Sequence, residues 1–420
     1  MRKLKATATL GTILLILLTL PNGRALAQNK PQSPAQTANA PFELKDGDRV
    51  VFLGNSLFEN DFQYGYLELA LTTRFPDRFV TFRNLGWTGD NVFGDARSTF
   101  TNPPTAYEHL MNQLTQAKPT LVFLGYGGVE AQEGEAGLPR FKEGLTKLLD
   151  KIDQLGAQTI LLSPIPVVAF DSSQNVTQRN AMLERYAAEI AKTAAERGKR
   201  FIDLYKPIQE LSRKAPILEN GVHLNETGYY HLATILEKGL GLAPSGQTVT
   251  INVGKNGAEA AAPVRVLDAG KENSTVKFTM DESYLPLPLP EQDPETGTVV
   301  SDGRTLKITG LKKGFYTLTA DNDEVVTASA KQWAEGVPIR QGASYTQAEQ
   351  LRQMILKKNE LFYFQYRPLN QTYILGFRSY EQGRHVKGLE EQNILIKWLE
   401  SQIALTRQPQ SKVYSLTLLK

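Results

Sequence analysis

A buried strand followed by a sharp turn is predicted by Arg49-Val50-Val51-Phe52-Leu53-Gly54-Asn55-Ser56-Leu57-Phe58-Glu59. Its β-branched and aromatic run is bounded by polar turn residues, a pattern typical of a strand that is covered on both faces. In an open α/β sheet, ligands bind in the crevice at the carboxyl ends of the strands, so Ser56 is a candidate functional residue. The alternative is that Ser56 merely caps the helix that follows.

Length and composition indicate a globular protein with more than one unit. The 420 residues suffice for one large domain and a smaller one. The chain is 41% hydrophobic and 22% charged, which is ordinary for a globular protein. It contains no cysteine, which excludes disulfides, cysteine-ligated zinc and covalently attached haem.

The first 27 residues have the pattern of a signal peptide. A basic start precedes a short apolar run, Ile13 to Leu20, and Ala25-Leu26-Ala27 is a small-x-small cleavage site. The run is too short to span a bilayer comfortably, so we expect cleavage near Ala27, an exported (periplasmic or extracellular) protein, and no stable membrane insertion after cleavage. An uncleaved anchor is the alternative. The segment holds four basic residues and no acidic one, so the formal charge falls from +3 to about −1 without it. Nothing in this charge favours nucleic acid as a partner.

The remainder of the chain divides into segments that differ in composition and in hydrophobic periodicity. Residues 28–41 read as a flexible leader, since they are rich in Gln, Pro, Ala and Asn. In residues 42–245, short apolar strands alternate with longer helical patterns, which predicts a parallel sheet with helices on both faces. Residues 246–335 show period-two alternation between turn residues, which predicts a small inserted β-sandwich. Residues 336–420 regain helical periodicity, and we expect them to pack on the α/β domain.

Four stretches, in this order along the chain, resemble the motifs of the SGNH (GDSL-type) hydrolases. They are Gly54-Asn55-Ser56 with Glu59, Asn84 to Val92, Leu124 to Glu130, and Glu219 to Asn225. The resemblance implies a three-layer α/β/α sandwich of flavodoxin-like type. It also implies that Ser56 is the nucleophile, that His223 is the general base, and that the backbone N–H groups of Ser56 and Gly89 bind the oxyanion.

Three positions depart from the family pattern. Asn55 replaces the Asp of Gly-Asp-Ser. Val129 stands where the family has an asparagine that donates its side-chain N–H to the oxyanion, and Glu130 follows at the position of an acid. Asn220 stands where an Asp usually orients the histidine, and Glu219 is the neighbouring carboxylate that could substitute. We expect Asn55, Val129, Glu130 and Arg378 to contact the substrate.

The sequence thus predicts an exported SGNH-type serine ester hydrolase that deacylates a small-molecule or polysaccharide ester, with a carbohydrate as the expected substrate. No cofactor and no metal is implied. The stretch from Arg367 to Gly383 resembles an exported planctomycete-type subgroup. Some members of that subgroup add a haem-binding region with Cys-x-x-Cys-His, which this chain lacks because it has no cysteine. The alternative function, favoured by Val129 and Asn220, is a catalytically impaired module that binds a glycan or a protein.

Overall fold

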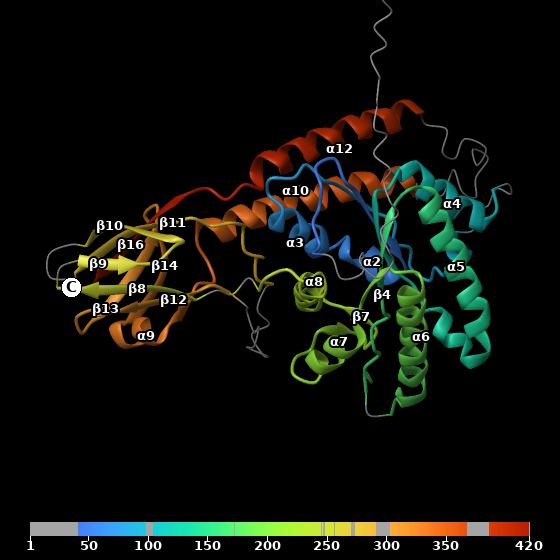
Figure 1. The fold of residues 1–420 in the computed structure, drawn as a ribbon, viewed down its shortest axis with the longest axis horizontal. Helices are drawn as coiled ribbons and strands as arrows, with labels where there is room; N and C mark the ends of the chain where they lie inside the picture. Colours follow the sequence, from blue (N-terminus) through green and yellow to red (C-terminus); the bar gives the residue numbers. More distant parts are fainter. Residues whose placement is uncertain are drawn as a thin grey trace, which may run out of the picture.

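The computed structural model describes residues 41–97, 104–171, 173–244, 246, 248–255, 257–269, 274–290, 303–367 and 386–419. The predicted signal peptide, nearly all of the predicted leader, and Arg378 lie outside these residues. Figure 1 shows an α/β unit and a smaller β-rich unit, with α10 (Ala343–Tyr366) and α12 (Val386–Thr406) extending from one to the other. Within the described ranges, no helix combines the length and the apolar character needed to cross a bilayer.

Five parallel strands form the sheet of the α/β unit, in the order β2-β1-β3-β4-β5. Their bounds are β1 Arg49–Gly54, β2 Thr81–Asn84, β3 Leu121–Gly125, β4 Gln158–Leu162 and β5 Arg200–Ile202. This is the flavodoxin-like order, in which the chain changes direction between β1 and β3 and leaves a crevice there. Gly54 pairs with Gly125 at that point, and a Cβ on Gly54 would lie 2.4 Å from the Gly125 carbonyl oxygen.

Helices cover both faces of this sheet, as predicted. One face is covered by α2 (Ser56–Asp61), α3 (Tyr66–Arg74), α7 (Tyr205–Ser212) and α8 (Glu226–Gly239), the other by α4 (Ala106–Ala117), α5 (Leu138–Gln154) and α6 (Thr177–Glu196). Val50 and Phe52 pack in the first layer, whereas Val51 and Leu53 pack in the second. Successive residues of a strand point to opposite faces, so a strand buried on both sides must be apolar throughout. The three-layer α/β/α fold is confirmed.

The β-rich unit consists of two sheets packed around a separate apolar core. One sheet has the order β10-β11-β16-β13-β14, with bounds β10 Val264–Ala269, β11 Thr275–Met280, β13 Phe315–Ala320, β14 Asp323–Ser329 and β16 Lys412–Leu418. The other has the order β15-β12-β8-β9, with bounds β8 Thr248–Gly254, β9 Gly257–Ala260, β12 Thr305–Thr309 and β15 Val337–Pro338. The short helix α9 (Ala330–Glu335) joins β14 to β15.

The end of the chain corrects the predicted division at residue 335. β16 comes from the segment that we expected to be helical, yet it lies in the middle of a sheet, between β11 and β13. The alternation of buried and exposed residues in β16 is that of a strand. The sequence of this seven-residue segment, however, does not indicate which sheet it joins. The β-rich unit is therefore closed by the last strand of the chain, so it is not a contiguous insert (Figure 1).

A buried ion pair fixes α10 on the α/β unit. The Lys358 ammonium lies 2.6 and 2.7 Å from the two carboxylate oxygens of Glu68 on α3 and also donates to the Phe82 carbonyl at 3.3 Å. Both side chains are almost fully buried. Removing one partner of such a pair leaves an uncompensated buried charge, so the pair strongly specifies where α10 docks.

Candidate active site

A cavity of about 250 Å³ lies at the carboxyl edge of the parallel sheet. It is lined by residues that follow β1, β2, β3 and β4, together with α6, α8 and a short hairpin. Five of the predicted site residues line it, namely Asn55, Ser56, Gly89, Val129 and His223. Ser56 and His223 are 167 positions apart in the sequence, and the fold brings both to this one cavity.

Ser56 is the first residue of α2, directly after the turn that ends β1. The helix is capped by Asn55, whose Oδ1 accepts a hydrogen bond of 3.1 Å from the Leu57 backbone N–H. A capping side chain satisfies one of the unpaired N–H groups of the first helical turn. Because Asn55 serves as the cap, the hydroxyl of Ser56 is not needed for this purpose.

Gly89 lies in the loop that follows β2 and has a φ of +79°. A Cβ built there would meet nothing closer than 4.0 Å, so the backbone conformation and not crowding favours glycine. Residues with side chains rarely adopt this region of φ. We refer to residues 85–90 as the oxyanion loop, because the predicted donor is the Gly89 N–H.

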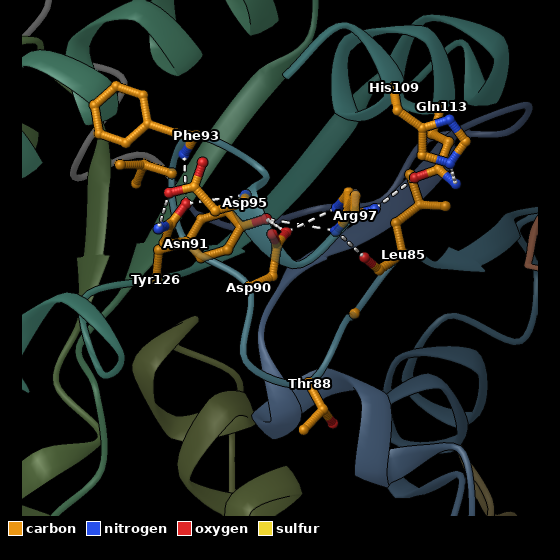
Figure 2. Close-up of polar contacts among 12 residues, drawn as sticks. Leu85, Thr88, Asp90, Asn91, Phe93, Asp95, Arg97, His109, Gln113 and Tyr126 are labelled. Atoms are coloured by element: carbon orange, nitrogen blue, oxygen red, sulfur yellow. Dashed lines mark hydrogen bonds and ion pairs between the residues drawn. The ribbon is translucent and has the colours of Figure 1, made fainter. Parts of the chain in front are cut away.

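A buried polar network holds both ends of the oxyanion loop, Leu85 and Asp90 (Figure 2). The fully buried Arg97 donates from Nε to Asp90 at 2.7 Å and from Nη2 to the Leu85 carbonyl at 2.7 Å. Asp90 also accepts a hydrogen bond of 2.7 Å from the Tyr126 hydroxyl, which follows β3. A third donor of Arg97, Nη1, binds Gln113 of α4 at 2.6 Å. Both Arg97 and Tyr126 bind Asp90 Oδ2, whereas the buried Asp90 Oδ1 has no hydrogen-bond partner among the described residues. The four hydrogen bonds of this network join the loop to β3 and α4 and so restrict its conformation.

The C-terminal end of α10 holds the same loop from the other side. Arg367 donates to Glu59 Oε2 at 2.9 Å, and its guanidinium lies 3.8 Å from the centroid of the Trp87 ring. Glu59 Oε2 also accepts from the Thr88 backbone N–H, one residue before Gly89. Tyr366, the neighbour of Arg367, donates to the Gly86 carbonyl at 2.9 Å. Glu59 therefore connects the helix of Ser56, the oxyanion loop and α10.

We expect Arg367→Ala to lower kcat for an aryl acetate about 10- to 100-fold, with KM changed less than about threefold. Without Arg367 the oxyanion loop loses one of its contacts, so the Gly89 N–H can move, and a shift of about 1 Å in a catalytic group can cost about 10² in rate. The thermal midpoint should change little, since a partly exposed ion pair contributes about 0–1 kcal/mol. Kinetics and thermal unfolding of the same preparation measure both effects.

Arg83→Ala is the matched control for this substitution. Arg83 forms an ion pair of 2.6 Å with Glu400 of α12 and lies 5.2 Å from the Phe362 ring, so it also joins the C-terminal helices to the sheet. Its ion-pair partner belongs to α12, and Phe362 is linked to the oxyanion loop through Tyr366, on which it stacks with ring centroids 5.0 Å apart. Equal losses of kcat in the two variants would mean that Arg367 only helps the helices to dock.

His223 lies on a two-stranded hairpin formed by β6 (Leu218–Glu219) and β7 (His223–Leu224). The turn between the strands has positive φ at both Asn220 (+43°) and Gly221 (+72°). Asn-Gly is a favoured pair for such a turn. A Cβ on Gly221 would lie 2.0 Å from the Val168 carbonyl oxygen, so this position requires glycine. Asn220 is thus explained by the turn, where its side chain is exposed.

Glu219 and His223 are directly paired across this hairpin. Residues opposite each other in an antiparallel pair project their side chains to the same face, about 4.5–5.5 Å apart at Cβ. The Glu219 carboxylate accepts a hydrogen bond of 3.2 Å from the Tyr64 hydroxyl, and the Tyr64 ring stacks on Tyr229, which lines the cavity. The register therefore places the Glu219 and His223 side chains on the same face of the hairpin, whereas Asn220 is at the tip of the turn.

Val129 lines the cavity, but Glu130 does not belong to the residues that form its wall. Glu130 is buried, and its two oxygens accept backbone N–H groups of Val92 at 2.9 Å and Gly127 at 2.8 Å. Burial raises the pKa of this carboxyl to about 7, against the lowering effect of the backbone donors. The structure thus gives Glu130 a structural role, in which it joins the loops after β2 and β3, and not the substrate contact that we expected.

Two features of the cavity were not identified from the sequence. Among its described lining residues, Arg179 of α6 is the only one with a fixed charge. Ser163, which follows β4, is a second serine in the wall, but its Oγ accepts from the Leu204 and Tyr205 N–H groups at 2.8 and 3.0 Å. Within the described residues, no group of three or more His, Asp or Glu side chains could hold a metal ion.

Comparisons with known proteins found a matching sequence family and similar solved structures. A sequence model of the GDSL-like lipase/acylhydrolase family matches residues 52–231. A solved structure described as BT4096, a gut microbial diltiazem-metabolizing enzyme, is similar with a TM-score of 0.69 and 20% identity, covering 90% of this chain and 99% of that one. Axe2, an acetylxylan esterase from Geobacillus stearothermophilus, has a TM-score of 0.38 and 15% identity, covering 48% of this chain and 98% of its own. A search of curated proteins found no significant match.

The matched segment contains Ser56, Gly89, Val129 and His223, all of which line the cavity. The similarity to BT4096 extends over both units, so it shows the fold of nearly the whole chain. Residues 52–231, which make up most of the α/β unit, are therefore a GDSL-like lipase/acylhydrolase domain of the SGNH type.

Proposed function

We propose that this protein is an exported serine ester hydrolase that removes a small acyl group from a carbohydrate. The observation that carries the proposal is the meeting of Ser56, His223 and Gly89 in one cavity, although they come from distant parts of the chain. A nucleophile, a base and an oxyanion donor around one cavity are the parts that acyl transfer requires.

In the first half of the reaction, Ser56 Oγ attacks the acyl carbon and His223 takes the hydroxyl proton. The carbonyl oxygen becomes an oxyanion, which the backbone N–H groups of Ser56 and Gly89 bind. When the tetrahedral intermediate collapses, His223 gives its proton to the departing sugar oxygen. In the second half, water attacks the acyl-enzyme with His223 as base, and the free acid leaves while Ser56 regains its proton.

The size of the cavity supports a small acyl group. About 250 Å³ is at or below the lower end of the range for ligand pockets, so a polysaccharide would lie across the opening and not inside. Apolar residues that include Val129, Ile165, Val167 and Leu183 line the wall and suit an acyl chain. Export rests on the N-terminal sequence, and the carbohydrate rests on the family resemblance.

A fluorophosphonate tests this function without knowledge of the substrate. We expect stoichiometric labelling of Ser56 in the folded protein, located by mass spectrometry of the peptide, and no labelling after heat unfolding. An aryl acetate and an acetylated sugar should compete with the label and should be hydrolysed. The alternative function, a binding module without catalysis, predicts neither labelling nor turnover, and that result would refute the ester hydrolase.

A further inference from the structure

Asn55 presents a side-chain amide to the cavity beside the nucleophile. Its Oδ1 is occupied by the Leu57 N–H at 3.1 Å, so the other end of the amide, Nδ2, points away from the helix. Nδ2 lies against the loop after β3, where a Cβ built on Gly128 would be 3.5 Å from it. Gly128 immediately precedes Val129, and all three residues line the cavity.

The same cavity lacks a side-chain hydrogen-bond donor at the position where the family has an asparagine. Val129 has no polar side-chain atom, so the loop after β3 provides no side-chain donor at that position. Removing a single oxyanion donor typically costs about 10²–10³ in turnover. Asn55 carries two N–H donors on Nδ2, and it replaces an aspartate, which when ionised could only accept hydrogen bonds.

We propose that the Asn55 Nδ2–H group is a third oxyanion donor, which replaces the side-chain amide absent at Val129. This inference rests on the proposed function. The carbonyl oxygen of the ester accepts Nδ2–H together with the N–H groups of Ser56 and Gly89 as its negative charge develops. The capping hydrogen bond fixes the amide in advance, so no reorganisation is needed when the charge forms. The same side chain therefore caps α2 with its oxygen and serves catalysis with its nitrogen.

Asn55→Asp is the direct test, because the two side chains have the same shape and cap helices equally well. We expect kcat for an aryl acetate to fall about 10²–10³-fold, with KM and the thermal midpoint nearly unchanged. Asn55→Ser separates the lost donor from the added negative charge, since serine also caps and is neutral. We expect it to lose at least about tenfold in kcat.

A second substitution returns the donor to the position where the family has it. Val129→Asn in the Asn55→Asp background should restore kcat to within about tenfold of the wild type. In the wild-type background, the same substitution should raise kcat less than about tenfold, because the donor is already supplied. A merely structural role of Asn55 would not produce such a rescue from a side chain on the neighbouring loop after β3.

The outcomes separate this inference from the proposed function. Full turnover in both Asn55→Asp and Asn55→Ser, with a wild type that depends on Ser56, would overturn the inference alone. Loss of turnover that Val129→Asn leaves unrestored would also count against it, provided that the double variant unfolds at the wild-type temperature. A wild type without Ser56-dependent turnover would overturn both.

Discussion

Ser56→Ala is expected to lower the turnover of an aryl acetate by about 10⁴-fold or more. Without the hydroxyl no acyl-enzyme can form, and the remaining groups provide only the residual rate that oxyanion binding and proximity support. The fold should survive, because the helix cap is the side chain of Asn55 and not that of Ser56. The measurement is kcat/KM for wild type and variant at equal concentration, with an active-site titration to exclude contaminating esterase.

Ser163 makes this experiment specific, because it is the second serine in the wall of the cavity. Its hydroxyl is fully buried, donates to the Pro164 carbonyl at 3.1 Å and accepts two backbone N–H groups, so it is not free to attack. Ser401→Ala, on the exposed side of α12, is a neutral control. Turnover that persists unchanged in Ser56→Ala would defeat the mechanism, whatever the substrate is.

The α/β fold could be predicted from the sequence because its signals are local and repeated. A strand such as β1 is apolar at every position, and this pattern requires cover on both faces. The paired glycines at the carboxyl ends of β1 and β3 are also explained by the fold, because a Cβ on Gly54 would lie 2.4 Å from the Gly125 carbonyl oxygen and a Cβ on Gly125 would lie 2.9 Å from the Phe58 ring. The order of motifs then gave the positions of Ser56, Gly89 and His223 without any contact being known.

The remaining features depend on long-range contacts that no local pattern encodes. Buried and more exposed residues alternate in β16, as in many strands. Its place between β11 and β13 is decided by two partner strands about 90 to 140 residues away in the sequence. Arg367 follows an ordinary helix, and only the fold brings it to Glu59 and Trp87. Glu130 reads as a candidate acid in a glycine-rich loop, whereas its backbone partners, one of them at Val92, keep it buried.

We expect Glu219→Gln to lower kcat by about 10²- to 10⁴-fold, because Glu219 is the carboxylate that we expect to orient His223. An amide can still accept from Tyr64, but it cannot stabilise the imidazolium that forms when Ser56 is deprotonated. The upper limit of the loss in kcat is that of removing the charge of a buried triad aspartate. Glu219 is exposed to solvent, which weakens its interaction with the imidazolium, so a smaller loss is expected. Glu210→Gln, an exposed carboxylate on α7, controls for the loss of charge.

Asn220→Asp distinguishes Glu219 from the position where the family usually has its acid. Residue 220 is the tip of a turn with positive φ, and the hairpin register pairs His223 with residue 219. Because aspartate is also tolerated in such a turn, the variant should fold normally and change kcat less than about threefold. The opposite pattern, a neutral Glu219→Gln and at least a tenfold gain in Asn220→Asp, would assign the acid to position 220. The tip of the hairpin would then have to rotate toward the imidazole. This rotation would break the 2.8 Å hydrogen bond from the Val168 N–H to the Gly221 carbonyl. Faster amide hydrogen exchange at Val168 would detect the break.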